Sequence, residues 1–144
     1  MTCRIIQYGS PEWQAEVSLR QEVLRKPLGL VFTPSDLAAE SEDLHIGCFD
    51  GDKLVGCCIL SAISSEKSCR KVRQVAVAEN KQQQGVGKLL MQYCENWCSQ
   101  NEISKIILHA RQTAVPFYLK LNYIIEGDEF LEVGILHSKM FKKI

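Results

Sequence analysis

A glycine-bearing loop between an apolar run and an amphipathic segment is the clearest sign of chemistry in this sequence. The run Val75-Ala76-Val77 leads toward the stretch Gln82-Gln83-Gln84-Gly85-Val86-Gly87-Lys88-Leu89. The first turn of a helix presents backbone N–H groups without internal partners, together with the positive end of the helix dipole. Glycines at that point let a phosphate approach the backbone closely, so the loop predicts a pyrophosphate site.

Two common phosphate-binding motifs do not fit this loop. A P-loop needs a glycine five residues before the Gly-Lys pair and Ser or Thr after it, but Gln82 and Leu89 stand there. A dinucleotide fingerprint needs a third glycine three residues after the second, where this chain has Leu90. A loop that uses glycine only for a tight turn remains the simplest alternative.

Three segments together resemble one enzyme family. The pattern Gln82-x-x-Gly85-x-Gly87 resembles the Gln/Arg-x-x-Gly-x-Gly/Ala signature of the GNAT acetyltransferase superfamily. The stretch from Phe117-Tyr118 to Asn122-Tyr123 resembles the GNAT segment that ends in Phe-Tyr-x-x-x-Gly-Phe, with asparagine in place of glycine. Residues 128–140 resemble the C-terminal signature of the ElaA/YjcF-like branch, except that leucine precedes the histidine where that branch has proline.

The resemblance implies direct transfer of an acetyl group from acetyl-CoA to an amine, either a small molecule or a peptide or protein lysine. It implies that the loop holds the pyrophosphate and that backbone groups of Val75, Ala76 and Val77 stabilise the thioester oxygen. Phe117 and Tyr118 would then adjoin the cosubstrate, and Tyr118 would protonate the leaving thiolate. A purely structural aromatic role for both side chains is the alternative.

The proton acceptor for the amine is less closely defined by the resemblance. Glu129, Glu132 and His137 lie in the C-terminal signature, and we assign catalytic roles to Glu129 and His137. A chain of water molecules could also remove the proton. We interpret His45 and His109, at strand ends, as buried, hydrogen-bonded side chains. A place beside a cleft stays open for His109, because strand ends border clefts in such sheets.

Two functions from other classes remain open at this stage. The chain could be an acyl-CoA-binding sensor that no longer catalyses, or an interaction domain that has only the fold. Tight binding of CoA without transfer to any amine would favour the sensor. Failure to bind CoA would favour the interaction domain.

The order of predicted elements indicates how these residues are positioned. Ser10-Pro11 begins a first helix, and Asp50-Gly51 between apolar runs predicts a β-hairpin. The further predicted elements are a strand at 71–77, an amphipathic helix at 86–99, a strand at 103–108, a short helix at 113–121, and closing strands at 123–125 and 135–140. With the resemblance, this order implies one GNAT-like α/β domain over residues 1–144. Its central sheet is mixed and mostly antiparallel, with helices on both faces and a central β-α-β unit that binds acetyl-CoA.

Charge and composition exclude several partners. Lysine plus arginine and aspartate plus glutamate each number 17, so nothing draws the whole chain to nucleic acid or to an anionic membrane.

The N-terminus has no signal-peptide pattern, and no apolar stretch approaches the roughly 20 residues of a spanning helix, so we expect a cytoplasmic protein. A homodimer is a family-level expectation only. We interpret Lys71 and Arg73 as a solvated strand face. The acidic stretch 36–43 could attract a cationic amine, but we interpret it as solvated.

The cysteines predict core packing rather than a metal site. There are seven, an odd number, and no Cys-x-x-Cys pair occurs. Cys94 and Cys98 stand four residues apart on a predicted helix, but no second ligand pair lies nearby in the sequence. We therefore expect no metal, and interpret these residues as small buried side chains.

Overall fold

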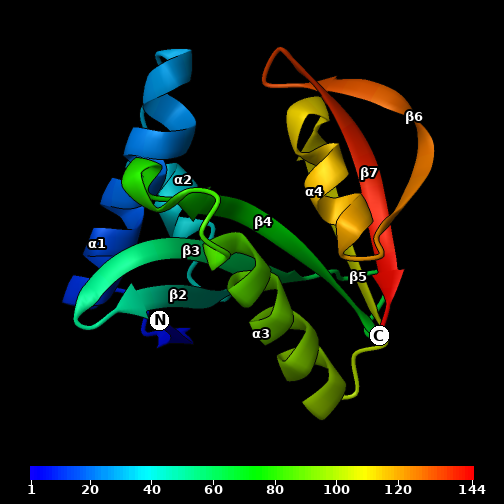
Figure 1. Cartoon of the computed structure of the whole chain (residues 1–144), viewed down its shortest axis with the longest axis horizontal. Helices are drawn as coiled ribbons and strands as arrows, with labels where there is room; N and C mark the ends of the chain where they lie inside the picture. Colours follow the sequence, from blue (N-terminus) through cyan, green and yellow to red (C-terminus); the bar gives the residue numbers. More distant parts are fainter.

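Seven strands form one sheet in the computed structural model, which describes all 144 residues (Figure 1). In chain order they are β1 (Thr2–Ile6), β2 (Leu44–Asp50), β3 (Lys53–Ala62), β4 (Cys69–Val77), β5 (Lys105–Arg111), β6 (Ile124–Glu132) and β7 (Ile135–Lys143). Their order across the sheet is β1-β2-β3-β4-β5-β7-β6, and only β4 and β5 run parallel. The predicted mixed, mostly antiparallel sheet is therefore confirmed.

Four α-helices connect these strands. They are α1 (Pro11–Arg20), α2 (Pro34–Ala38), α3 (Val86–Gln100) and α4 (Val115–Lys120). Short π and 3-10 turns, Gln21–Arg25 and Lys26–Leu28, follow α1, and further 3-10 turns at Glu79–Lys81 and Gln112–Ala114 precede α3 and α4. Helix α3 links β4 to the parallel β5, which confirms the predicted β-α-β unit. None of the helices combines the length and apolar character needed to cross a bilayer.

Local sequence signals explain where the helices begin and end. The Ser10 hydroxyl accepts a hydrogen bond from the Trp13 N–H (3.2 Å) and so caps the start of α1. Thr33 and Asp36 form a reciprocal capping box at the start of α2. After α4, Asn122 takes a left-handed φ of 71°, a conformation that asparagine adopts more readily than most residues with a Cβ.

Helices cover both faces of the central strands. The Cys58 Sγ lies 3.5 Å from the Cys94 Sγ of α3, whereas the neighbouring Cys57 points to the opposite face, which α1 covers. Both β3 cysteines are fully buried. This two-sided burial explains why the run 54–60 is apolar throughout instead of alternating. Six of the seven cysteines are buried, which confirms their interpretation as core residues.

Four polar side chains form one buried network beside α1. Arg20 donates to Glu16 (Nη1–Oε2, 3.0 Å) and to Glu40 (Nη2–Oε2, 2.7 Å). His45 Nδ1 lies 3.0 Å from the Glu16 carboxylate, and its Nε2 lies 2.9 Å from the backbone oxygen of Glu40. All four residues are at most 3% exposed. The interpretation of the stretch 36–43 as solvated is thus wrong for Glu40, which the Arg20 guanidinium holds in the interior.

The same contacts fix the protonation of His45. Both ring nitrogens face acceptors, so both carry protons. Burial alone would lower the pKa of His45, but the hydrogen bonds to Glu16 and Glu40 raise it overall. The network therefore pairs two cations with two carboxylates, and His45 is the buried, hydrogen-bonded residue that the sequence predicted.

Candidate active site

Strands β4 and β5 separate halfway along their length. Their pairing runs from Cys69–Lys105 to Val72–Leu108 and stops there, although both strands continue. A bulge in β4 marks the same point, because Gln74 and Val75 together lie opposite a single residue of β3, and Gln74 has a φ of 56°. A bulge bends the strand that contains it, which accounts for the separation. The edge of residues 75–77 that faces β5 consequently has no strand partner.

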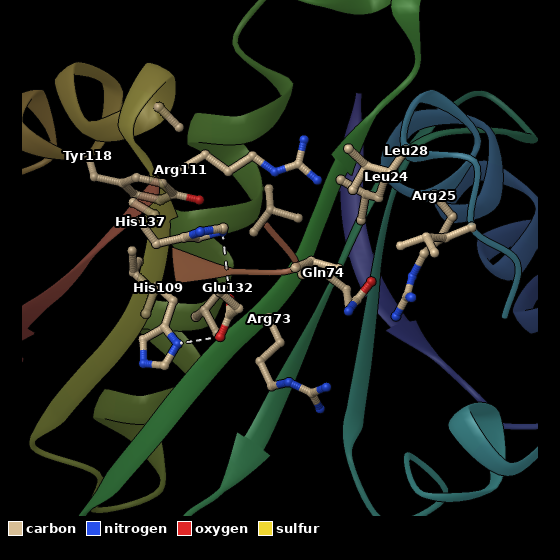
Figure 2. Close-up of a pocket in the computed structure, with 17 residues that line it drawn as sticks. Leu24, Arg25, Leu28, Arg73, Gln74, His109, Arg111, Tyr118, Glu132 and His137 are labelled. Atoms are coloured by element: carbon tan, nitrogen blue, oxygen red, sulfur yellow. Dashed lines mark hydrogen bonds and ion pairs between the residues drawn. The ribbon is translucent and has the colours of Figure 1, made fainter. Parts of the chain in front are cut away.

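A cavity of about 230 Å³ lies at this gap (Figure 2). Figure 2 shows Tyr118 and His137 on one side of it, and Leu24 and Arg25, from the segment after α1, on the other. The remaining lining side chains are Leu28, Leu30, Val72, Arg73, Gln74, Val75, Leu108, His109, Ala110, Arg111, Ala114, Glu132 and Val133. The cavity is therefore built from both halves of the sheet, and the connector after α1 forms one of its sides.

The glycine loop has the backbone geometry of an anion site. Gly85 is left-handed (φ 85°, ψ 6°) and Val86 begins α3 directly after it. A left-handed residue followed by a right-handed one aims successive N–H groups into one concave surface. Leu89 already donates its N–H to the Gly85 oxygen (3.0 Å), so the N–H groups left for a ligand are those of residues 86–88. A Cβ added at Gly85 would meet nothing within 4 Å, so this surface is open to a pyrophosphate.

Side chains of the loop hold its shape. The Gln82 side-chain amide donates to the Val77 carbonyl (3.2 Å), and that of Gln84 donates to the Asn80 carbonyl (3.1 Å). Gln83 adopts a φ of 63°, a left-handed conformation that is uncommon for a residue with a Cβ. Residues 82–85 and Lys88 are exposed, whereas Val86 is buried. The stretch predicted to bind a cosubstrate is therefore an ordered, solvent-facing turn.

Helix α4 connects this loop to the cavity. A Cβ at Gly87 would lie 3.0 Å from the Phe117 ring, so glycine allows the first turn of α3 to approach α4. The Phe117 and Tyr118 rings lie edge to face, with centroids 4.9 Å apart. Tyr118 in turn lines the cavity. A ligand with its phosphates on the loop can thus reach the cavity along α4.

Tyr118 is placed to donate a proton into the cavity. The residue is only 7% exposed and packs within the hydrophobic core. Burial, with a smaller effect of Cys58 and Cys94, raises the pKa of its hydroxyl above the ordinary value. The hydroxyl is therefore protonated at neutral pH and available as a hydrogen-bond donor or general acid.

His137 faces the cavity with one nitrogen free to take a proton. Its Nδ1 lies 2.7 Å from the Ile135 carbonyl and must donate to it, which leaves Nε2 as the accepting nitrogen. Glu132 lies between two histidines, with Oε2 3.6 Å from His137 Nε2 and Oε1 3.0 Å from His109 Nδ1. Burial would raise the pKa of Glu132, but the hydrogen bond and charge of His109, with His137 and Lys71, lower it overall. The carboxylate is thus ionised and would stabilise a proton on His137.

The structure brings His137 and Tyr118 to the cavity but does not bring Glu129 there. Three residues of β6, 127–129, bulge out opposite the single residue Ser138 of β7. Glu129 falls in this bulge and is exposed, so the carboxylate at the cavity is that of Glu132.

The structure also differs from the sequence-based interpretation at Lys71, Arg73 and His109. Lys71 and Arg73 do not form a solvated strand face, because Lys71 Nζ lies 3.3 Å from His109 Nδ1 and Arg73 lines the cavity. His109 is not a core residue but part of the cavity wall. Gln74 also lines the cavity and was not predicted. Its only signal in the sequence is that it follows Arg73 as a second consecutive polar residue and so breaks the alternation of β4.

Comparison with known proteins identifies the family. Residues 33–144 match the family model described as "Acetyltransferase (GNAT) domain". The chain is 31% identical over 125 residues to "Uncharacterized N-acetyltransferase YjcF" of Bacillus subtilis (strain 168), covering 86% of this chain and 87% of that protein.

Solved structures agree on the fold. Escherichia coli ElaA superimposes with a TM-score of 0.80 at 20% identity, over 97% of each chain. An aminoglycoside 6'-N-acetyltransferase complexed with coenzyme A has a TM-score of 0.78 at 16% identity, over 99% of this chain and 97% of that one. The family match and the 31% identical relative show the family, and the chain belongs to the GNAT family of N-acetyltransferases.

Proposed function

We propose that the protein binds acetyl-CoA and transfers the acetyl group directly to a primary amine held in the cavity. The observation that carries this proposal is the continuous path from the anion-binding turn at Gly85, past Gly87 and Phe117, to Tyr118 at the cavity. Coenzyme A has this layout, because its pantetheine arm extends from the pyrophosphate to the reactive sulfur. The likeness in fold to a neighbour solved with coenzyme A supports the same cosubstrate.

The residues at the two ends of this path have separate tasks. The N–H groups of residues 86–88, with the dipole of the 15-residue helix α3, bind the pyrophosphate. The unpaired edge of β4 at residues 75–77 lies where the thioester enters the cavity, and its backbone groups stabilise charge on the thioester oxygen.

Proton transfers in the cavity complete the reaction. The amine nitrogen attacks the thioester carbon, so an N–C bond forms and the C–S bond breaks. His137 Nε2 accepts the proton that the amine loses, and the Glu132 carboxylate stabilises the resulting imidazolium. The Tyr118 hydroxyl gives its proton to the leaving sulfur, and solvent later returns a proton from His137 to Tyr118.

Replacing Tyr118 with phenylalanine tests the acid step. We expect kcat to fall about 100-fold, because general acid catalysis typically contributes at least that factor. The dissociation constant of acetyl-CoA should stay nearly unchanged, because the ring packing against Phe117 is retained. The measurements are thiol release during turnover with an amine panel, and calorimetric titration of acetyl-CoA.

Tyr93→Phe is the matched control, since Tyr93 lies on α3 and does not line the cavity. It should leave both quantities unchanged. If Tyr118→Phe turns over as fast as the parent protein, Tyr118 is not the acid.

A further inference from the structure

The charges around the cavity do not match those of a plain amine acceptor. Three arginines line it, Arg25, Arg73 and Arg111, against the single carboxylate of Glu132. Such a wall repels a simple ammonium ion and attracts an anion. The excess of positive charge therefore points to a negative group on the molecule that enters.

Carboxylates of the protein neutralise the positive charge of these arginines only in part. Glu132 is engaged with His109 and His137. Arg73 lies 3.7 Å from Asp43, a long ion pair that leaves the guanidinium partly exposed. Arg25 lies over the Phe32 ring (4.4 Å), and neither Arg25 nor Arg111 forms an ion pair with a carboxylate of the chain.

The phosphates of acetyl-CoA do not explain these arginines either. The anion-binding turn of residues 82–88 is a separate surface, and none of its residues lines the cavity. The arginines come instead from the segment after α1, from the bulged part of β4, and from the end of β5. In Figure 2 the Arg111 and Arg25 side chains lie on opposite sides of the cavity, with Gln74 between them.

Gln74 supplies a second, independent sign of a polar ligand. Its Oε1 is buried and has no hydrogen-bond partner in the protein. A buried polar atom without a partner destabilises the folded protein, and so does a non-glycine residue held at a positive φ. Both occur at this one residue of the cavity wall. An N–H donor on a bound ligand would satisfy the Gln74 oxygen.

We propose that the acceptor is a small amine that also carries a carboxylate or a phosphate. Arg25, Arg73 and Arg111 supply the positive charge that attracts the anionic end, and the Gln74 oxygen accepts a hydrogen bond from an N–H group of the ligand. A cavity of about 230 Å³ suits a small metabolite of this class. This inference rests on the proposed function, since it names the substrate class of the same site.

The test compares amines that differ in their acidic group. Suitable pairs are 4-aminobutyrate with butylamine and phosphoethanolamine with ethanolamine, with α-amino acids against their amides as a third set. Initial rates of acetyl transfer give kcat/KM for each amine. In at least one pair, we expect kcat/KM for the amine with the acidic group to exceed that for its partner without one by at least about 10-fold. The pair that shows this difference tells carboxylate recognition from phosphate recognition.

Arginine variants then assign the preference to the cavity. Arg111→Gln and Arg25→Gln should lower kcat/KM for the anionic amine about 10- to 100-fold, as expected for lost hydrogen bonds to a charged group. They should raise kcat/KM for the amine without an acidic group, because less positive charge repels its ammonium ion, and they should leave acetyl-CoA affinity unchanged. Arg111→Lys, which keeps the charge, should recover part of the loss. Arg4→Gln, an exposed position on β1, is the control and should behave as the parent protein.

Three results would overturn the inference. Equal kcat/KM for amines with and without an acidic group in every pair would overturn it while leaving the proposed function intact. A loss of acetyl-CoA affinity in Arg111→Gln and Arg25→Gln, with unfolding midpoints unchanged, would assign the arginines to the cosubstrate instead. No acetyl-CoA binding and no transfer to any amine would remove the proposed function, and this inference with it.

Discussion

Replacing His137 with glutamine is expected to lower kcat about 100-fold, while acetyl-CoA binds as before. Glutamine cannot accept the amine proton, and the nitrogen that is lost is the one that Ile135 leaves free and Glu132 faces. The anion-binding turn lies on α3, away from β7, which is why the cosubstrate should still bind. The measurement is steady-state acetyl transfer from pH 5 to 9, together with calorimetric titration of acetyl-CoA.

Two glutamate variants separate a base from a structural residue. Glu132→Gln should lower kcat, since the carboxylate that stabilises the imidazolium is gone. Glu129→Gln is the matched control and should be fully active, because Glu129 lies in the exposed bulge of β6. Full activity of His137→Gln would contradict the assignment.

The buried network around Arg20 should give the largest effect on stability. Arg20→Met leaves Glu16 and Glu40 facing each other without their cation, while His45 remains bonded to both residues. Removing one partner from a buried ion pair typically costs about 3–5 kcal/mol. We expect the free energy of unfolding to fall by that amount, measured by urea denaturation followed by circular dichroism at pH 7.

The matched control is Arg4→Met, which removes an exposed ion pair with Glu12 and should shift the urea midpoint little. His45 adds a pH dependence with a defined sign. Its pKa is raised in the folded state, so its stabilising contribution is complete below the unfolded value near 6.5 and is lost as pH rises through the folded value. An Arg20→Met protein as stable as Arg4→Met would show that the network does not stabilise the fold.

The features that could be predicted from the sequence are those that depend on neighbours in the chain. The hairpin at Asp50-Gly51, the helix starts at Ser10 and Val86, and the left-handed Asn122 all follow from local backbone preferences. The glycine loop belongs to the same class, since its strand, turn and helix are contiguous. Strand β1 was not predicted, because only one residue of this edge strand is buried and the apolar alternation is absent.

The cavity depends on register between distant segments, which the residue pattern does not encode. Whether Glu129 or Glu132 reaches the cavity is decided by a bulge of β6 against β7, and no spacing rule reveals that bulge. Arg25 comes from a connector whose path is set by packing over the sheet. Lys71 and Arg73 fit a solvated strand equally well in the sequence, and only the tertiary structure brings Lys71 Nζ to 3.3 Å from His109 Nδ1 and Arg73 into the cavity wall.

Titration calorimetry with acetyl-CoA and with acetylpantetheine tests the central claim most directly. Acetylpantetheine keeps the thioester and lacks the pyrophosphate that residues 86–88 are expected to bind. We predict saturable binding of acetyl-CoA and binding of acetylpantetheine weaker by about 100-fold or more, consistent with the loss of several hydrogen bonds to a charged group. Equal affinity for the two compounds would contradict the role of the loop, and no binding of acetyl-CoA at millimolar concentration would contradict the proposed function as a whole.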